Sequence, residues 1–161
     1  MRRTDRQITD ESEIRGIVER ARIVHLGMID GARPYVVPLH YGCEWHEDGL
    51  ALWCHGAREG RKIDVLRANP CVFVEIDCDM EIVSGGDVAC RYGSYYASVM
   101  GDGTATIVED PAEKVHGLRC LMRTQTGRDF DISPQMAAAV SVLRIDVPQV
   151  SAKARKKVAG A

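Results

Sequence analysis

The sequence lacks the features that mark membrane, secreted and nucleic-acid-binding proteins. No stretch approaches the roughly 20 continuous apolar residues of a membrane helix. The opening run MRRTDRQITDESE has basic residues but no apolar segment behind them, unlike a secretory signal. A formal net charge of -2 provides no basic surplus for nucleic acid. We therefore expect a cytoplasmic protein that binds neither membranes nor nucleic acid.

Common catalytic and nucleotide-binding signatures are also missing. The chain has no Gly-Lys-Ser/Thr phosphate loop and no Gly-x-Ser-x-Gly nucleophile turn. The run Gly101-Asp102-Gly103 leads into β-like sequence, so the dinucleotide-binding fingerprint fails in both spacing and context. Any function must rest on a less common motif.

Disulfide and metal frameworks are not expected. The cysteines are even in number, but a chain of this size with a substantial core needs no disulfides, and we expect reduced thiols. Cys43 with His46, and Cys54 with His55, offer metal-ligand atoms. Structural zinc generally uses two well-spaced ligand pairs on turns, whereas His55 follows an apolar strand. We predict no metal site.

The composition fits one globular domain over residues 1–161. Hydrophobic residues make up 45% of the chain, which is enough to bury a core, and no repeat or linker divides it. Basic residues cluster only at the two ends: Arg2, Arg3 and Arg6 at the start, and Lys153, Arg155, Lys156 and Lys157 at the finish. Such runs are usually solvated tails, and we interpret them so.

Short, mostly antiparallel strands dominate the expected secondary structure. Helices are predicted at 10–22, 56–69 and 111–122 and after Ser133-Pro134; strands are predicted at 23–29, 34–41, 50–55, 71–78, 95–108 and 140–147. The pair Asp30-Gly31 predicts a hairpin, and Pro38 an edge or kinked strand. Gly101 and Gly103 indicate a bulge or a close backbone approach. The final SAKARKK is expected to leave the domain. The pattern favours a mainly β fold, a barrel or sandwich with added helices.

The most informative segment is CHGAREGRKID, residues 54–64. A strand ends here, glycines allow a tight turn, and Arg61 and Lys62 stand at the start of a helix. A helix N-terminus presents free N–H groups and a partial positive charge to anions. Arg61 adds a planar fork and Lys62 a point charge, which together suit a phosphate. A solvated basic helix face explains the same pattern equally well.

HGAREGRKID, with PYVVPLHY upstream and SYYASVMGDGTATIVED downstream, resembles the flavin-nucleotide-binding split barrels related to pyridoxamine 5'-phosphate oxidase. It is most similar to the nitroimidazole-resistance (Nim) subfamily, which MRRTDRQI and SAKARKK also fit. The resemblance therefore spans nearly the whole chain. It implies a six-stranded antiparallel split β-barrel that forms a homodimer, with FMN in clefts between the subunits.

The resemblance also assigns site residues. Arg61 and Lys62 would hold the FMN phosphate, and residues 37–39 would lie along the isoalloxazine with their backbone groups. His55 would lie near the cofactor, and Ser98 would help to bind flavin or phosphate. The full set of cofactor-binding positions is Val37, Pro38, Leu39, His55, Gly56, Gly60, Arg61, Lys62, Ser98 and Lys153.

The chain departs from the family pattern at two places. Ala97 stands where many relatives carry a charged residue, and no tryptophan precedes Lys153. These departures concern the substrate side of the site.

The function that the resemblance implies is an FMN-dependent oxidoreductase. Electrons would come from a nicotinamide donor, NAD(P)H, and pass to a small flat aromatic acceptor such as a nitroaromatic. His55, as the catalytic residue, would donate a proton to the acceptor or hold it by a hydrogen bond; a hydrogen-bonded strand-end histidine is the structural alternative.

A non-enzymatic carrier or sensor on the same barrel, holding flavin, deazaflavin or haem, is the alternative function. Haem would use His55 or His25 as its axial ligand. Pyridoxamine-phosphate oxidase activity is less expected, because the chain shows no obvious second cation cluster for a phosphorylated substrate.

Overall fold

One antiparallel sheet of eight strands runs through the computed structural model, which describes residues 4–156. Its strands are β1 (Gln7–Ile8), β2 (Ile23–Asp30), β3 (Arg33–His46), β4 (Gly49–Gly56), β5 (Cys71–Val83), β6 (Gly93–Val108), β7 (Ser141–Val147) and β8 (Ser151–Arg155). The helices are α1 (Glu11–Arg20), α2 (Arg61–Ala68), α3 (Pro111–Thr126) and α4 (Pro134–Ala138), with 3-10 turns η1 (Thr4–Arg6) and η2 (Ala89–Arg91). No helix of this part of the chain is long and apolar enough to span a membrane.

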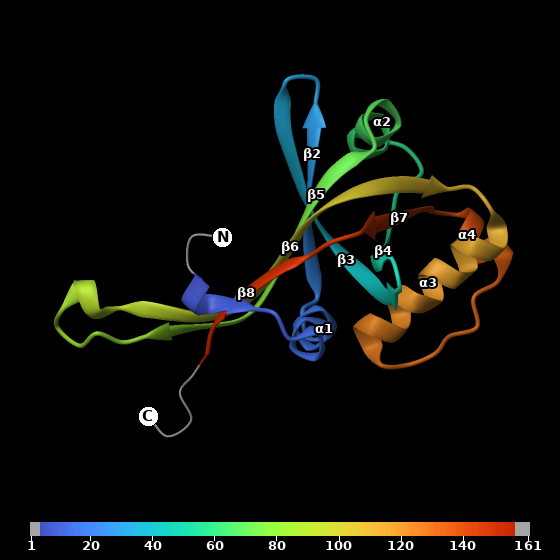
Figure 1. Cartoon of the computed structure of the whole chain (residues 1–161). Coiled ribbons are helices and arrows are strands. Elements are labelled where there is room, and N and C mark those ends of the chain that lie inside the picture. Colours follow the sequence, from blue (N-terminus) through green and yellow to red (C-terminus); the bar gives the residue numbers. More distant parts are fainter. Residues whose placement is uncertain (1–3, 157–161) are drawn as a thin grey trace.

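Six of the strands close into a ring. The order β6-β5-β2-β3-β4-β7 returns to its start because β7 also pairs with β6, and every pairing is antiparallel. Two strands change partner halfway. Residues 33–40 of β3 pair with β2 and residues 41–46 with β4; residues 104–108 of β6 pair with β7 and residues 96–100 with β8. This confirms the predicted six-stranded antiparallel split barrel, and Figure 1 shows the strands wrapped around one another.

The predicted departure of the C-terminal tail is wrong. Residues 151–155 form β8, which pairs with β6 and with β1. The physical reason is that alternate residues of this segment face the core, as in a strand, but the basic residues between them make the sequence look like a solvated tail. Ala152 is buried, whereas Lys153 and Arg155 lie only partly exposed beside it.

The solvated-tail interpretation is also wrong for the inner members of both basic runs. Arg6 donates a 3.4 Å hydrogen bond to the hydroxyl of Tyr96. The Lys153 ammonium lies 5.9 Å from the centre of the Tyr96 ring. Basic side chains here pack against aromatic rings, which attract cations through their π faces. Arg2, Arg3 and Lys157 lie outside the described residues.

The local signals for helix ends are largely confirmed. The Asp10 carboxylate accepts a 2.8 Å hydrogen bond from the Glu13 N–H and caps α1. α2 is shorter than predicted, because the chain enters it through Gly60 at φ 129°, a conformation that favours glycine. α3 is longer than predicted and ends at Gly127, with φ 69°.

The proline and one glycine signal within the predicted strands are also confirmed. Pro38 lies in the half of β3 that only β2 pairs, as expected for an edge position. A Cβ on Gly101 would stand 2.6 Å from the Gln149 carbonyl oxygen, so the predicted close approach of another backbone is confirmed. The irregular register lies elsewhere, between Cys78 and Glu81 in β5.

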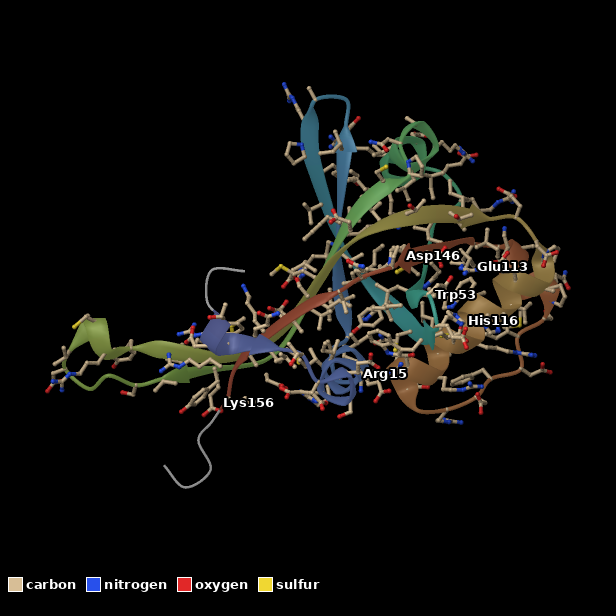
Figure 2. All side chains as sticks on the ribbon, viewed as in Figure 1. Arg15, Trp53, Glu113, His116, Asp146 and Lys156 are labelled. Atoms are coloured by element: carbon tan, nitrogen blue, oxygen red, sulfur yellow. The ribbon has the colours of Figure 1, made fainter. Side chains whose placement is uncertain are left out.

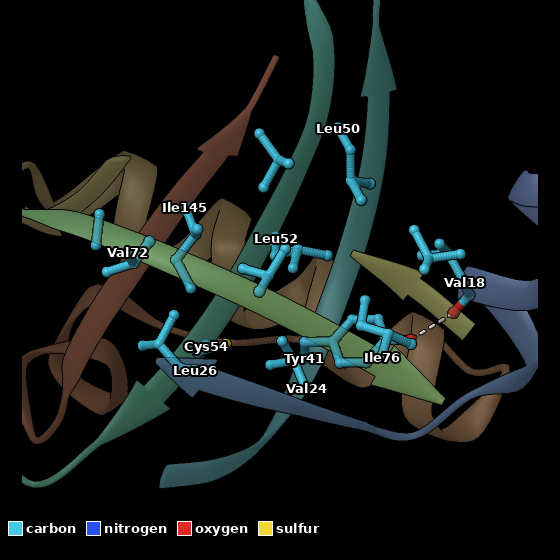
Figure 3. Packing of buried hydrophobic residues seen from close by; sticks show 14 of the residues in the cluster. Val18, Val24, Leu26, Tyr41, Leu50, Leu52, Cys54, Val72, Ile76 and Ile145 are labelled. Atoms are coloured by element: carbon cyan, nitrogen blue, oxygen red, sulfur yellow. Dashed lines mark hydrogen bonds between the residues drawn. The ribbon is translucent and has the colours of Figure 1, made fainter. Parts of the chain in front are cut away.

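The barrel interior is filled by alternate side chains of the ring strands (Figure 3). Val24, Leu26, Leu52 and Ile76 are fully or almost fully buried there. Tyr41 is buried among them, and its hydroxyl donates a 2.6 Å hydrogen bond to the Val18 carbonyl. That carbonyl lies in the last turn of α1, where helix carbonyls lack intrahelical partners. This bond joins α1 to the barrel.

α3 covers the outer side of β4 and of the second half of β3. A Cβ on Gly42 would overlap the α3 backbone at Cys120 and Leu121, so only glycine permits this approach. Trp53 packs against the ring of His116 with centroids 5.3 Å apart, as labelled in Figure 2. Glu44 binds both, at 2.7 Å from Trp53 Nε1 and 2.8 Å from His116 Nε2. α3 therefore covers the outer face of this half of β3.

Replacing Tyr41 by phenylalanine should lower the free energy of unfolding by about 1–2 kcal/mol, because the Val18 carbonyl is left unpaired in a buried place. Urea unfolding followed by tryptophan fluorescence measures this. Tyr92→Phe, at a residue that is 51% exposed, is the control and should change little. Equal stabilities of the two variants would contradict the role given to the buried hydroxyl.

Candidate functional site

The β2–β3 hairpin, whose β3 strand has the open edge, and α2 lie at the top of Figure 1, with β2 on the side nearer the helix. Residues 33–40 pair with β2 on one side, and no other described strand pairs with their second side. β4 ends beside this edge, at His55 and Gly56. The short loop 57–60 then leads into α2. Backbone groups, a histidine and a helix N-terminus thus converge here.

Arg61 fixes α2 against the β2–β3 hairpin. Its Nε and Nη2 atoms lie 2.8 Å and 2.7 Å from the Asp30 carboxylate. Its guanidinium also lies over the Tyr35 ring, 4.3 Å from the centroid. Sequence reasoning missed Asp30 and Tyr35, because no local signal places this hairpin beside the helix. Arg61 already has one carboxylate partner, so an anion bound here would share it.

Lys62 has no such partner. It is half-buried and forms no ion pair within residues 4–156. A Cβ on Gly56 would stand 2.7 Å from its Nζ atom, so the ammonium folds back over that glycine. Burial lowers the pKa of Lys62 below its ordinary value. A partly desolvated cation without a counter-charge is the main electrostatic feature of this site.

The helix adds unpaired donors to this cation. Gly60 precedes α2 and offers no side-chain cap. The first helical N–H to reach a backbone acceptor is that of Ile63, which donates to the Gly60 carbonyl at 2.9 Å. The N–H groups of Arg61 and Lys62 precede it, where a helix presents free donors to an anion. The residues present fit a phosphate group.

His55 stands at the end of β4 beside Lys62. Partial burial lowers the pKa of His55, and the nearby charges of Lys62 and His40 act in the same direction. The imidazole is therefore neutral at pH 7. Because the fold favours the neutral form, His55 contributes stability above its ordinary pKa that is lost as the pH falls. No hydrogen bond to its ring is found in the described part of the chain, so the structural alternative gains no support.

The three β3 positions assigned to the isoalloxazine differ in direction. Val37 and Leu39 are partly buried and pack against the barrel core. Pro38 is exposed on the outer face, in register with His25. All three residues have their backbone on the open edge of β3.

Ser98 and Lys153 form a second group on the outer face of the sheet. Ser98 of β6 lies in register between Lys153 of β8 and Asp77 of β5. Within residues 4–156, no hydrogen bond or ion pair joins either residue to His55, Arg61 or Lys62. The predicted site residues thus divide into two groups in one chain.

The closed six-stranded antiparallel ring has the fold of the split-barrel proteins, which include flavin binders. The sequence profile of the family described as pyridoxamine 5'-phosphate oxidase matches residues 10–154. The chain belongs to this family, as the resemblance predicted.

Solved structures extend this result. A candidate 5-nitroimidazole antibiotic resistance protein of Bacteroides thetaiotaomicron is 30% identical, with a TM-score of 0.77 over 92% of this chain and 86% of the other. A flavocytochrome of Azotobacter vinelandii is 20% identical, with a TM-score of 0.75 over 98% and 72%. A FAD-binding protein of Mesorhizobium loti is 24% identical, with a TM-score of 0.64 over 94% and 98%. A search of curated proteins found no match.

Replacing Lys62 by methionine should raise the pKa of His55 toward its ordinary value, because one of the nearby positive charges is removed. Proton NMR titration of the histidine ring signals measures this. Lys114→Met, at a lysine of α3, is the matched control. Identical His55 titrations in both variants would show that Lys62 does not act on the imidazole.

Proposed function

We propose that the chain is a cytoplasmic FMN-dependent oxidoreductase that reduces small flat acceptors such as nitroaromatics. The observation that supports this best is the half-buried, unpaired Lys62 ammonium at the uncapped start of α2. A phosphate monoester carries up to two negative charges and several acceptor oxygens, so it suits this cation and the free N–H groups beside it. Such a phosphate terminates FMN, which favours FMN over FAD for this site.

The open edge of β3 extends the site to a flat ring. On an antiparallel edge strand, alternate residues direct their N–H and C=O groups outward. In the proposed complex the outward-facing backbone of residues 37–39 meets the polar edge of the isoalloxazine, with Pro38 offering its C=O but no N–H. When bound, FMN supplies the redox chemistry between a nicotinamide donor and the acceptor.

His55 positions the acceptor in this proposal. A neutral imidazole with a lowered pKa is a poor source of protons at pH 7, but it donates a hydrogen bond from one ring nitrogen. Of the two predicted roles, holding the acceptor by a hydrogen bond therefore has the better support.

A homodimer would complete the site. Large apolar side chains are exposed on the outer face of β2, β3 and β5: Ile29 is 48% exposed, Val36 58% and Phe73 45%. Phe73 and Val36 are both in register with Gly27, so they flank one flat strip. Apolar patches of this kind mark protein contacts. If two protomers pair over this face, Ser98 and Lys153 of one protomer would lie beside Lys62 of the other.

Purified protein should show flavin absorption bands, or take up added FMN, and Lys62→Met should weaken FMN binding more than about tenfold. The same variant without FMN should melt about 1–3 °C higher, because an unpaired, partly buried charge is gone. Fluorescence titration and thermal unfolding measure the two effects, with Lys114→Met as the control. Unchanged FMN affinity would place the phosphate elsewhere, and a haem spectrum would favour the carrier alternative.

Phe73→Glu should convert the dimer to a monomer, because a charge would enter the apolar strip of the interface. Light scattering after size-exclusion chromatography gives the mass. Met136→Glu, at a residue of α4 that is 60% exposed, should leave the dimer intact. A Phe73→Glu protein that keeps the wild-type mass would contradict the proposed interface.

A further inference from the structure

A histidine and two carboxylates converge on the outer face of β2 and β5. His25 Nδ1 lies 3.0 Å from Glu75 Oε2 and 3.8 Å from Asp77 Oδ1. One ligand atom of each residue lies within 4.8 Å of the other two. The sheet produces this arrangement, because His25 and Glu75 are directly in register and Asp77 follows on the same face.

The charge of this group is not balanced. The side chains are 43%, 29% and 34% exposed for His25, Glu75 and Asp77. Within residues 4–156, no lysine or arginine forms an ion pair with either carboxylate. By contrast, Asp30 and Asp79 on the same two strands each bind an arginine. Two partly desolvated negative charges therefore share one imidazole, an arrangement that a cation would stabilise.

Ser98 provides a second observation that points to a missing ligand. It is only 4% exposed, and its Oγ atom has no hydrogen-bond partner in the described structure. It lies in register with Asp77, so both side chains leave the same face of the sheet. Lys153, on its other side, directs its ammonium over the Tyr96 ring instead. Buried hydroxyls rarely remain unpaired, and a water or ligand held beside Asp77 would satisfy this one.

We propose that His25, Glu75 and Asp77 bind a divalent transition-metal ion, for which zinc is the best probe. Zinc accepts imidazole nitrogen and carboxylate oxygen at about 2.0–2.2 Å, so neighbouring ligands of a tetrahedral ion stand about 3.3–3.5 Å apart. The two distances from His25, 3.0 Å and 3.8 Å, lie on either side of this value. Three protein ligands leave one position for water, within reach of the face on which Ser98 lies.

The three proposed ligands are not among the residues proposed to hold FMN, but Ser98 lies in register with Asp77 and is assigned to the FMN site as well. Sequence reasoning sought metal ligands at close spacing, at Cys43 with His46 and at Cys54 with His55. The proposed ligands are 50 residues apart in the chain, and only the pairing of β2 with β5 joins them.

The test uses the full-length protein after treatment with a chelator, followed by equilibrium dialysis against zinc chloride. Visible absorption with cobalt(II) reports the geometry. We expect one zinc per chain, with affinity at least tenfold lower in Glu75→Gln and in Asp77→Asn. His116→Gln is the matched control, because His116 contacts one carboxylate oxygen of Glu44 at 2.8 Å in the same way but lacks a second carboxylate; it should keep wild-type affinity.

Two results would overturn the proposal. Absence of zinc binding at micromolar concentrations would mean that the three side chains do not form a metal site. Equal affinity of wild type, Glu75→Gln and Asp77→Asn would place any bound zinc elsewhere. Both substitutions preserve side-chain size, and a thermal melt of each variant shows that the fold is retained. FMN titration of the same variants separates this result from the flavin proposal.

Discussion

Closure of the sheet through β6 and β7 is the constraint on which the rest of the molecule depends. β6 pairs with β5 along one edge and divides its other edge between β7 and β8, which removes most open edges from the sheet. In the ring, β3 lies between β2 and β4 but pairs with β2 only through residues 33–40 and with β4 only through residues 41–46. Residues 33–40 are left with one partner. The open strand edge proposed to meet the cofactor is thus a geometric product of closing the barrel.

The two proposed sites share one electrostatic principle. At most surface positions described above, a charge meets an opposite one, as for Arg20 with Asp79. Within the described residues, the Lys62 ammonium has no ion-pair partner, and the carboxylates of Glu75 and Asp77 share a single imidazole. Each imbalance lies where burial makes an unpaired charge costly. An anion at the first place and a cation at the second restore the balance.

Local signals in the sequence predicted most of the fold. Asp10 with Glu13, the Asp30-Gly31 turn and Gly101 each act on neighbouring residues or on one crossing strand, so their effects can be read from the sequence. β8 was missed because its cations concealed a period of two. The Arg61-Lys62 segment was recognised, but its surroundings were not. Asp30 and Tyr35 contact Arg61, and His40 acts on His55, only because the β2–β3 hairpin folds against this segment.

The open edge of β3 carries a risk that its prolines reduce. An unpaired strand edge is a template on which a strand of another chain can add, and such addition leads to aggregation. Pro34 and Pro38 stand four residues apart in this edge, so both face the same way and neither has an N–H to donate. A strand that added to this edge would therefore lack two of its backbone hydrogen bonds. The flat ring of the proposed cofactor needs only a few acceptors and donors from this edge, so the two prolines would weaken its binding far less than the addition of a strand.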